Sequence, residues 1–111
     1  GLGDVYKRQV LYYTTNASAN FTINIRGDAS NTLNSVLAVN QSITIAFLNT
    51  NGATAYYASA VQVDGVAVTV KWQGGTAPTT GNASALDAYV FTVIKTGSAT
   101  YVVMGSQTKF A

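Results

Sequence analysis

Three segments decide the fold: VAVTVKW at residues 66–72, AYVFTVIK at 88–95 and ATYVVMGSQTKF at 99–110. All three are rich in β-branched and aromatic residues, which are enriched in strands. In the first segment the valines and Trp72 alternate with Ala, Thr and Lys. This period of two places one face of a strand on a core and the other face in water. The segments therefore predict three strands.

The second and third segments predict a hairpin. A two-residue turn at residues 97–98 places Val93 opposite Val102 and Phe91 opposite Met104. Large hydrophobic side chains of the two strands then lie opposite each other on one face of the hairpin. We expect that side to face the core.

The composition favours an all-β protein. A chain of 111 residues has the length of one domain, and such a chain buries roughly two-thirds of its unfolded surface. The residues are 48% hydrophobic and only 9% charged, which suits pleated strands better than surface helices rich in Lys and Glu. Because the chain has no Cys and no His, disulfides, imidazole bases and the usual zinc ligands are excluded.

Charge and hydropathy exclude further classes. The formal net charge of +2 is small and scattered, so we expect no nucleic-acid binding, which needs Lys and Arg gathered on one face. The apolar runs are far shorter than the ~18 residues of a membrane helix, so we expect no membrane insertion. Asp28, Asp64 and Asp87 each lie beside a turn or strand end, and their spacing does not predict a paired acid and base. We expect no catalytic residues, cofactor or metal, and therefore no enzyme.

Residues 1–9, GLGDVYKRQ, resemble a translated transposon-derived sequencing adapter. The codons GGG CTC GGA GAT GTG TAT AAG AGA CAG encode this string in full, which is a specific match. We therefore treat residues 1–9 as a non-native segment that makes no contact with the core. Residues 10–111 are then one domain, and we expect the natural protein to extend N-terminally beyond Val10.

The rest of the chain contains four more candidate strands and one short helical turn. VLYYTT at 10–15 has the composition of a strand but no clean alternation, and its partner strand would belong to the missing N-terminal part. FTINIR at 21–26 and SITIAF at 42–47 alternate with a period of two, and TAYYASAVQV at 54–63 follows an Asn-Gly turn. Within residues 28–40, Leu33, Val36 and Leu37 share a helical face that Ser30 or Asn31 could cap.

The two predicted hairpin turns conflict. The Asp-Gly turn pairs the 66–72 strand with the strand before it and places Tyr57 opposite Trp72. The Asn-Gly turn pairs the 42–47 strand with the same 54–63 strand. In that pairing the hydrophobic residues of 43–47 lie on the face of the sheet opposite to the one that carries Tyr57. Either a bulge shifts the register within residues 56–60, or the 43–47 strand belongs to the opposing sheet of a sandwich. We prefer the second alternative.

These segments together predict an all-β fold. The predicted architecture is an antiparallel, jelly-roll-like β-sandwich of about seven to eight strands with at most one short helical turn. Residues 73–86 form a long, turn-rich loop that contains the only Pro, and loops of this length are often functional.

Five aromatic residues allow two interpretations. They either form a sugar-stacking platform or belong to the core, which is the more frequent role of aromatic residues in alternating strands. These residues are Tyr56, Tyr57, Trp72, Tyr89 and Tyr101.

Seven sequence blocks carry a resemblance to a known family. They are RGD (26–28), TLNS (32–35), FLNTNGATAYY (47–57), DG (64–65), KWQGGTAP (71–78), GNAS (81–84) and SQTKFA (106–111). With these blocks the chain resembles a C-terminal domain of virion structural and tail-fibre proteins of tailed bacteriophages, especially marine phages. Similar sequences have Gly where this chain has Asn40, and Asn tolerates positive φ.

The resemblance implies a non-enzymatic structural module of the virion, in a tail fibre or related appendage. The alternative is a carbohydrate-binding, host-recognition module on a fibre tip. The implied partners are other virion proteins, further copies of the chain (a trimer among the arrangements) and, for the alternative, host surface glycans. The implied location is the extracellular virion, assembled in the host cytoplasm, with this chain as the C-terminal domain of a longer protein.

The long loop and the most specific block mark one candidate ligand or assembly surface. Its residues are Trp72, Gln73, Gly74, Gly75, Pro78 and Asn82.

Overall fold

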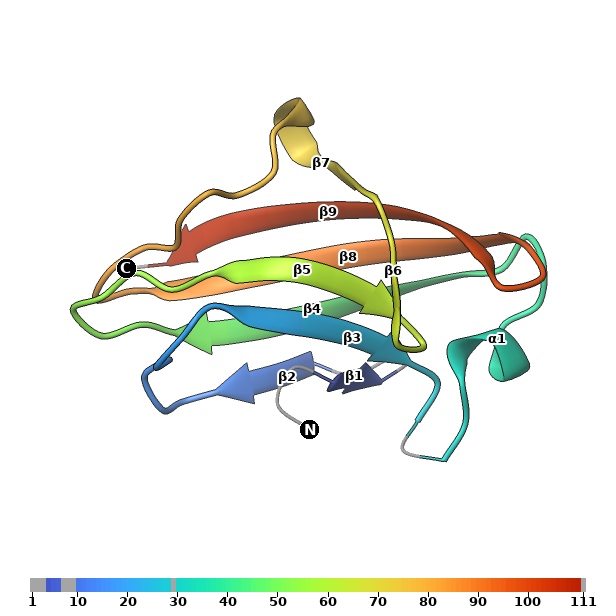
Figure 1. Cartoon of the computed structure of the whole chain (residues 1–111), viewed down its shortest axis with the longest axis horizontal. Helices are drawn as coiled ribbons and strands as arrows, with labels where there is room; N and C mark the ends of the chain where they lie inside the picture. Colours follow the sequence, from blue (N-terminus) through green and yellow to red (C-terminus); the bar gives the residue numbers. More distant parts are fainter. Residues whose placement is uncertain (1–3, 7–9, 29, 111) are drawn as a thin grey trace.

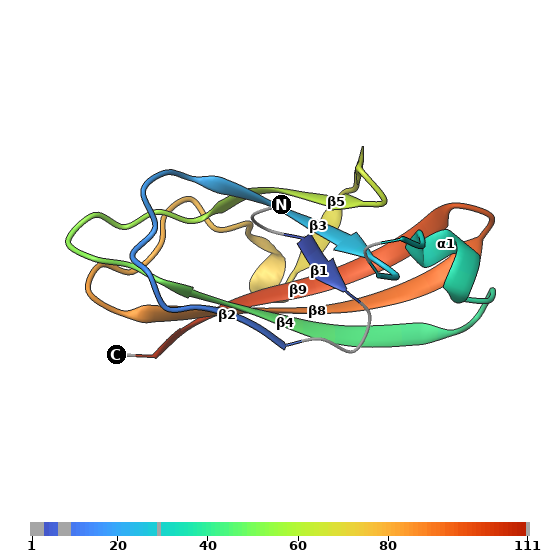
Figure 2. The same ribbon diagram turned by 90° about the horizontal axis from the view of Figure 1, so that it is seen from below.

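The computed structural model describes residues 4–6, 10–28 and 30–110, which form two facing β-sheets (Figures 1 and 2). One sheet has the strand order β1-β3-β5-β6 and the other the order β2-β4-β8-β9-β7. The elements are β1 Asp4–Tyr6, β2 Val10–Tyr13, β3 Phe21–Arg26, α1 Leu33–Val36, β4 Ser42–Thr50, β5 Ala58–Val63, β6 Val66–Ala67, β7 Val70–Trp72, the 3-10 turn η1 Gln73–Gly75, β8 Leu86–Gly97 and β9 Thr100–Phe110.

The predicted all-β sandwich is confirmed, and the strand pairing is mixed. The ladders β4–β8, β8–β9 and β5–β6 are antiparallel, as expected. The pairings β1–β3, β2–β4, β3–β5 and β7–β9 are parallel. The described residues contain nine strands rather than seven or eight, because residues 66–72 are divided and residues 4–6 form a strand. The short helical turn predicted within residues 28–40 is present as α1, whereas the 3-10 turn η1 was not predicted.

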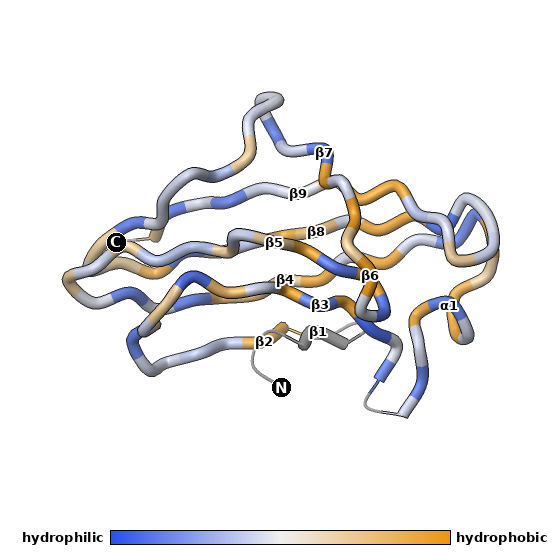
Figure 3. The backbone as a smooth tube through the Cα atoms, in the orientation of Figure 1, coloured by the Kyte–Doolittle hydropathy of each residue, from blue (hydrophilic) through white to orange (hydrophobic). Residues whose placement is uncertain are grey.

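The core lies between the two sheets and is built by the predicted alternation. The inward residues of β3, β4, β5 and β8 are buried. The most hydrophobic stretches of these strands lie toward the end of the sandwich where α1 is found (Figure 3). The buried hydrophobic cluster comprises Ile23, Ile25, Leu33, Leu37, Ile43, Ile45, Phe47, Ala58, Val61, Val63, Tyr89, Phe91, Val93 and Val103.

The preferred solution to the conflict between hairpins is confirmed. Strand β4 pairs with β8 in one sheet, whereas β5 pairs with β3 in the other. The Asn-Gly pair therefore does not form a hairpin turn, because the chain crosses between the sheets after residue 50. The hydrophobic faces of β4 and β5 can then meet across the core.

Residues 66–72 do not form one strand. The Asp-Gly turn does pair Val63 with Val66, but the chain then crosses to the other sheet. There β7 runs parallel to β9, with Trp72 opposite Gly105 rather than Tyr57. The Trp72 ring packs edge-on against Phe91, with ring centroids 5.7 Å apart. A Cβ at Gly105 would lie 2.9 Å from the Phe91 ring, so glycine leaves the room that this contact needs.

The β8–β9 hairpin exists, but the predicted register is wrong by one residue on β9. Val93 lies opposite Val103, and Phe91 lies opposite Gly105. The turn residues are Ser98 and Ala99, and an irregularity between residues 95 and 97 adds the extra residue. Val103 is therefore buried, whereas Met104 is 42% exposed.

The expectation that residues 1–9 stay apart from the fold is wrong for Asp4–Tyr6. These residues form β1, which pairs with β3 as the edge strand of its sheet. The remaining residues of this segment lie outside the described chain. Strand β2 follows and joins the edge of the other sheet through β4.

Helix α1 covers one end of the sandwich (Figure 2) and is held from both sides. The Thr32 side chain caps it, rather than Ser30 or Asn31. The Asp64 carboxylate accepts hydrogen bonds from the backbone amides of Leu33 at 2.6 Å and Asn34 at 3.0 Å. At the other end of the helix the Nζ of Lys95 donates to two carbonyl oxygens at 2.8 Å. A charge of the favourable sign thus lies at each end.

Asn40 has a φ of 71°. It therefore adopts the left-handed conformation that Asn tolerates. No helix among the described residues has the length and apolar character to cross a membrane.

We expect Phe91→Ala to lower the free energy of unfolding by about 3 to 5 kcal/mol, because Phe91 is fully buried. Thr92→Ala on the outer face should cost less than about 1 kcal/mol. Urea unfolding of both variants measures the difference. Both variants are measured on dilute protein, so that equal large losses would mean that Thr92 is packed within the monomer as tightly as Phe91.

We also expect stability to fall in alkaline solution because of Tyr101. Burial and the neighbouring Asp64 carboxylate raise the pKa of Tyr101 from 10.0 to about 12. The folded state then holds the phenol proton more tightly, so this contribution is complete below pH 10.0 and disappears as the pH approaches about 12.

Urea unfolding at several alkaline pH values, compared between the wild type and Tyr101→Phe, isolates this contribution. Tyr89, whose pKa is also raised, chiefly by burial, is present in both proteins. The wild type should lose stability relative to the variant as the pH rises. Parallel pH profiles would show that Tyr101 does not contribute.

Candidate functional site

Most of the predicted surface residues lie together where β7 ends and η1 begins. Gln73, Gly74 and Gly75 are exposed, and Trp72 and Pro78 are partly buried. Gly74 and Gly75 have φ values of 78° and 81°, which glycine adopts without strain. Trp72 is thus the last residue of the edge strand β7, and the other four residues belong to the loop that follows it.

Two hollows flank Gln73 on this loop. A shallow groove of about 500 Å³ crosses the outer side of the five-stranded sheet, and its lining includes Lys71, Trp72, Gln73, Val90, Met104 and Ser106. A smaller hollow of about 170 Å³ lies between the loop and β9, lined by Trp72, Gln73, Thr76, Pro78, Ser106 and Gln107. Trp72 and Gln73 line both hollows, so the loop presents a surface to a ligand or partner on either side.

Asn82, the sixth predicted residue, has a structural contact instead. Its backbone amide donates to the Asp87 carboxylate at 3.0 Å and its side-chain amide at 2.5 Å. Asn51 also donates to Asp87 at 3.4 Å and to the carbonyl of Tyr56 at 2.9 Å. Asp87 is fully buried. Asn82 therefore ties the long loop to the buried polar groups at the end of the sandwich remote from α1.

The five aromatic residues do not form one platform. Tyr89 is fully buried, and its hydroxyl accepts hydrogen bonds from the Ala58 amide and the Gln107 side chain. Trp72 packs on Phe91, and the Tyr101 hydroxyl lies 3.5 Å from Asp64. The core interpretation is therefore right for Tyr89, and Trp72 and Tyr101 pack partly against the core at separate places.

The carboxylates of Asp28, Asp64 and Asp87 each accept hydrogen bonds from the backbone, those of Asp28 and Asp87 from loop amides and that of Asp64 from the first amides of α1. Asp28, the last residue of the RGD block, accepts from the amides of Ser30 and Asn31 at 2.8 Å. The hydrogen bond from the Asn31 side chain is the main reason that the pKa of Asp28 is lowered. Among the residues that the structure describes, no three His, Cys, Asp or Glu side chains converge to hold a metal ion.

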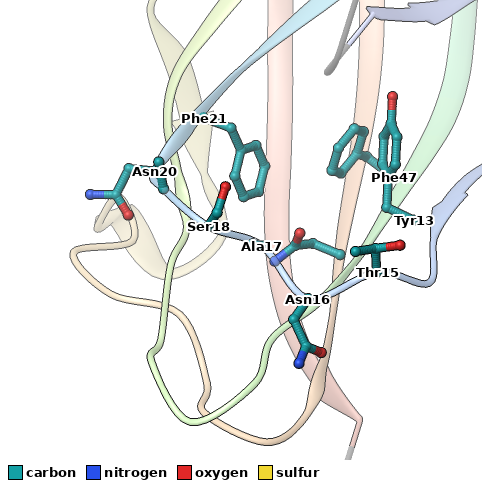
Figure 4. A pocket seen from close by; sticks show the side chains of 10 residues that line it. Tyr13, Thr15, Asn16, Ala17, Ser18, Asn20, Phe21 and Phe47 are labelled. Carbon is teal, nitrogen blue, oxygen red and sulfur yellow. The ribbon is translucent and has the colours of Figure 1, made fainter.

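A pocket that the sequence analysis did not identify lies between the sheets, beside the turn that joins β2 to β3 (Figure 4). Its volume is about 260 Å³, and its lining consists of Tyr13, Thr15, Asn16, Ala17, Ser18, Ala19, Asn20, Phe21, Phe47 and Asn49. The Phe47 ring lies 5.3 Å from the Tyr13 ring and 5.4 Å from the Phe21 ring, measured between centroids. The lining therefore combines aromatic rings with amides and hydroxyls and has no charged side chain.

The alternation of residues 21–25 correctly predicts that Phe21 faces inward. The pocket itself depends on the parallel pairing of β2 with β4, which places Tyr13 opposite Asn49 and brings its ring against that of Phe47. No local sequence signal specifies that pairing. Chemically, the pocket fits a small neutral group with one apolar face and polar edges.

No relative assigns a role to either surface. No family model, curated protein or solved structure matches this chain.

Proposed function

We propose that this chain is a non-enzymatic structural module of a tailed-bacteriophage virion, in a tail fibre or related appendage. The seven sequence blocks that resemble phage structural proteins support this assignment. The proposed partners are other virion proteins and further copies of the chain. The proposed location is the extracellular particle, after assembly in the host cytoplasm.

The observation that carries the structural role is the use of charged groups to hold the backbone. Asp28, Asp64 and Asp87 accept hydrogen bonds from turn or helix amides. Lys95, only 8% exposed, donates to carbonyls of the α1 segment. A catalytic acid or base must instead exchange a proton with a substrate within hydrogen-bond reach. Charges used in this way favour a rigid scaffold over a reaction centre.

The test of this proposal is the protein content of purified particles. Particles of a phage whose genome encodes this sequence should contain the tryptic peptides 72–95 and 96–109, which end at lysines. Mass spectrometry of particles after density-gradient purification should detect both peptides at a constant ratio to the major capsid protein. Their presence in infected-cell lysate but not in purified particles would contradict the proposal.

A second candidate function is carbohydrate binding, which the aromatic pocket favours. The C–H face of a sugar ring packs well on aromatic rings, and amide and hydroxyl groups bind its hydroxyls. The pocket offers Tyr13, Phe21 and Phe47 together with Asn16 and Asn20. The hollows at Trp72 offer fewer aromatic rings.

Glycan-array binding by the whole chain tests this second function. Asn16→Ala should weaken binding about tenfold or more if the pocket holds the sugar, which corresponds to about 1.4 kcal/mol. Gln73→Ala is the matched control at the other surface, because both side chains are exposed. Trp72→Ala is less suitable because it also removes the contact with Phe91. Absence of glycan binding, or binding that neither substitution affects, would argue against a sugar site.

A further inference from the structure

Most of the large hydrophobic side chains that the described chain exposes lie on the outer side of the five-stranded sheet. Five of the seven lie there, namely Val10 at 66%, Tyr12 at 55%, Val90 at 36%, Met104 at 42% and Phe110 at 55% exposed. The ladder registers place them outward, opposite Ala46, Leu48, Ser106, Thr92 and Leu86 respectively. The other two are Val39 and Val66, which lie in or beside turns. We call this surface the outer apolar face.

The outer apolar face carries no charge over four strands. Every outward position of β2, β4, β8 and β9 is hydrophobic, Ser or Thr. Lys71 lies outward on the edge strand β7, opposite Met104, where its amine can reach water. The view along the edges of the sheets shows no other element of the described chain over the outer side of β2, β4, β8 and β9 (Figure 2).

The outer side of the other sheet is different. On β3 the positions that alternate with buried isoleucines are Thr22, Asn24 and Arg26, and Gln62 lies beside Asn24 on β5. This is the polar pattern of a sheet face in water. The contrast indicates that only the outer apolar face is built to be covered.

We propose that a second copy of this chain covers the outer apolar face, in a two-fold symmetric dimer with the five-stranded sheets face to face. Further copies of the chain are among the proposed partners, and the outer apolar face specifies, independently of the phage assignment, how two copies meet. A two-fold contact joins the same patch of both subunits, so any charge on the patch would meet its own like charge near the axis. A face without charge can pack against a copy of itself without this repulsion. It has no charged groups that could form ion pairs with a charged partner.

The size of the face agrees with a stable dimer. Strand spacing of about 4.8 Å and a rise of about 3.3 Å per residue give the sheet a flat area of roughly 600 Å². Projecting side chains make the accessible area larger than the flat area. A specific interface buries about 800 Å² per partner, so the outer apolar face is of the required order. Two sheet faces also pack well on each other, at about 10 Å.

The groove beside Trp72 is continuous with this face. Val90 and Met104 line the groove together with Trp72 and Gln73. The loop surface predicted for assembly therefore lies at the rim of the proposed dimer interface.

Sedimentation equilibrium of the full chain over a range of concentrations tests the proposal. The wild type should show a dimer mass that dissociates on dilution. The double variant Val90→Lys/Met104→Lys should be monomeric, with a dimer dissociation constant raised at least about 100-fold, because it places like charges in the interface. The control Thr22→Lys/Gln62→Lys has the same diagonal spacing on the polar sheet face and should dimerise like the wild type.

A monomer at all concentrations up to about 1 mM, a trimer, or a dimer that survives the Val90/Met104 substitutions would overturn the proposal.

A cross-linking experiment keeps the proposal testable even if the double variant does not fold. The chain has no Cys, so Val90→Cys, on the central strand β8, introduces a single thiol. A short bis-maleimide should convert the Val90→Cys protein to covalent dimer faster by at least tenfold than the Thr22→Cys protein. Equal rates for the two proteins would overturn the proposal.

Discussion

The structure depends on the inward face of β8. This strand is paired on both sides, with β4 and β9, and its side chains Tyr89, Phe91 and Val93 are completely buried. Phe91 supports the edge strand β7 through Trp72, and Tyr89 reaches across the core to the amide of Ala58 on β5. Strand β8 thus contacts its neighbouring strands within the sheet and also contacts the opposite sheet. Most of the other elements are positioned by packing against it.

The two ends of the sandwich are closed by polar groups whose partners are within the chain. At one end Asp64 and Lys95 hold the two ends of the α1 segment. At the other end Asp87 and Asn51 bind the long loop and the segment before β5. Among the described residues, every buried side-chain nitrogen and oxygen has a hydrogen-bond partner. A buried polar group without a partner costs about 1 to 3 kcal/mol, so these networks determine where the loops lie.

The two candidate surfaces follow from this arrangement and lie at separate places on the sandwich. Strands β2, β4, β8 and β9 present an uncharged apolar exterior, with Lys71 and the Trp72 loop at its rim. The β2–β3 turn instead encloses a small aromatic pocket. An assembly role uses the first surface and a binding role the second, so that the two proposed functions are physically separable. Both require a scaffold that holds its shape, which the fixed carboxylates and Lys95 supply.

The sequence alone determined the fold class and the inward faces of the central strands. Alternation with a period of two correctly predicted that Ile23, Ile45 and Phe91 are buried, because this local pattern leaves a strand only one face for the core. The hydrophobic faces of β4 and β5 also conflicted within one flat hairpin, which left a bulge or a separate sheet as alternatives, and the preferred second alternative is the observed one.

Tertiary structure decided what depends on contacts between distant residues. The division of 66–72, the register of β9, the parallel pairings and the aromatic pocket each follow from such contacts, for example Trp72 against Phe91 and Tyr13 beside Phe47. Asn82 likewise binds Asp87 rather than joining the surface of Trp72 and Pro78, because the buried carboxylate needs donors. A hydrophobic pattern specifies which face of a strand is buried, but it does not specify which distant strand or side chain covers that face.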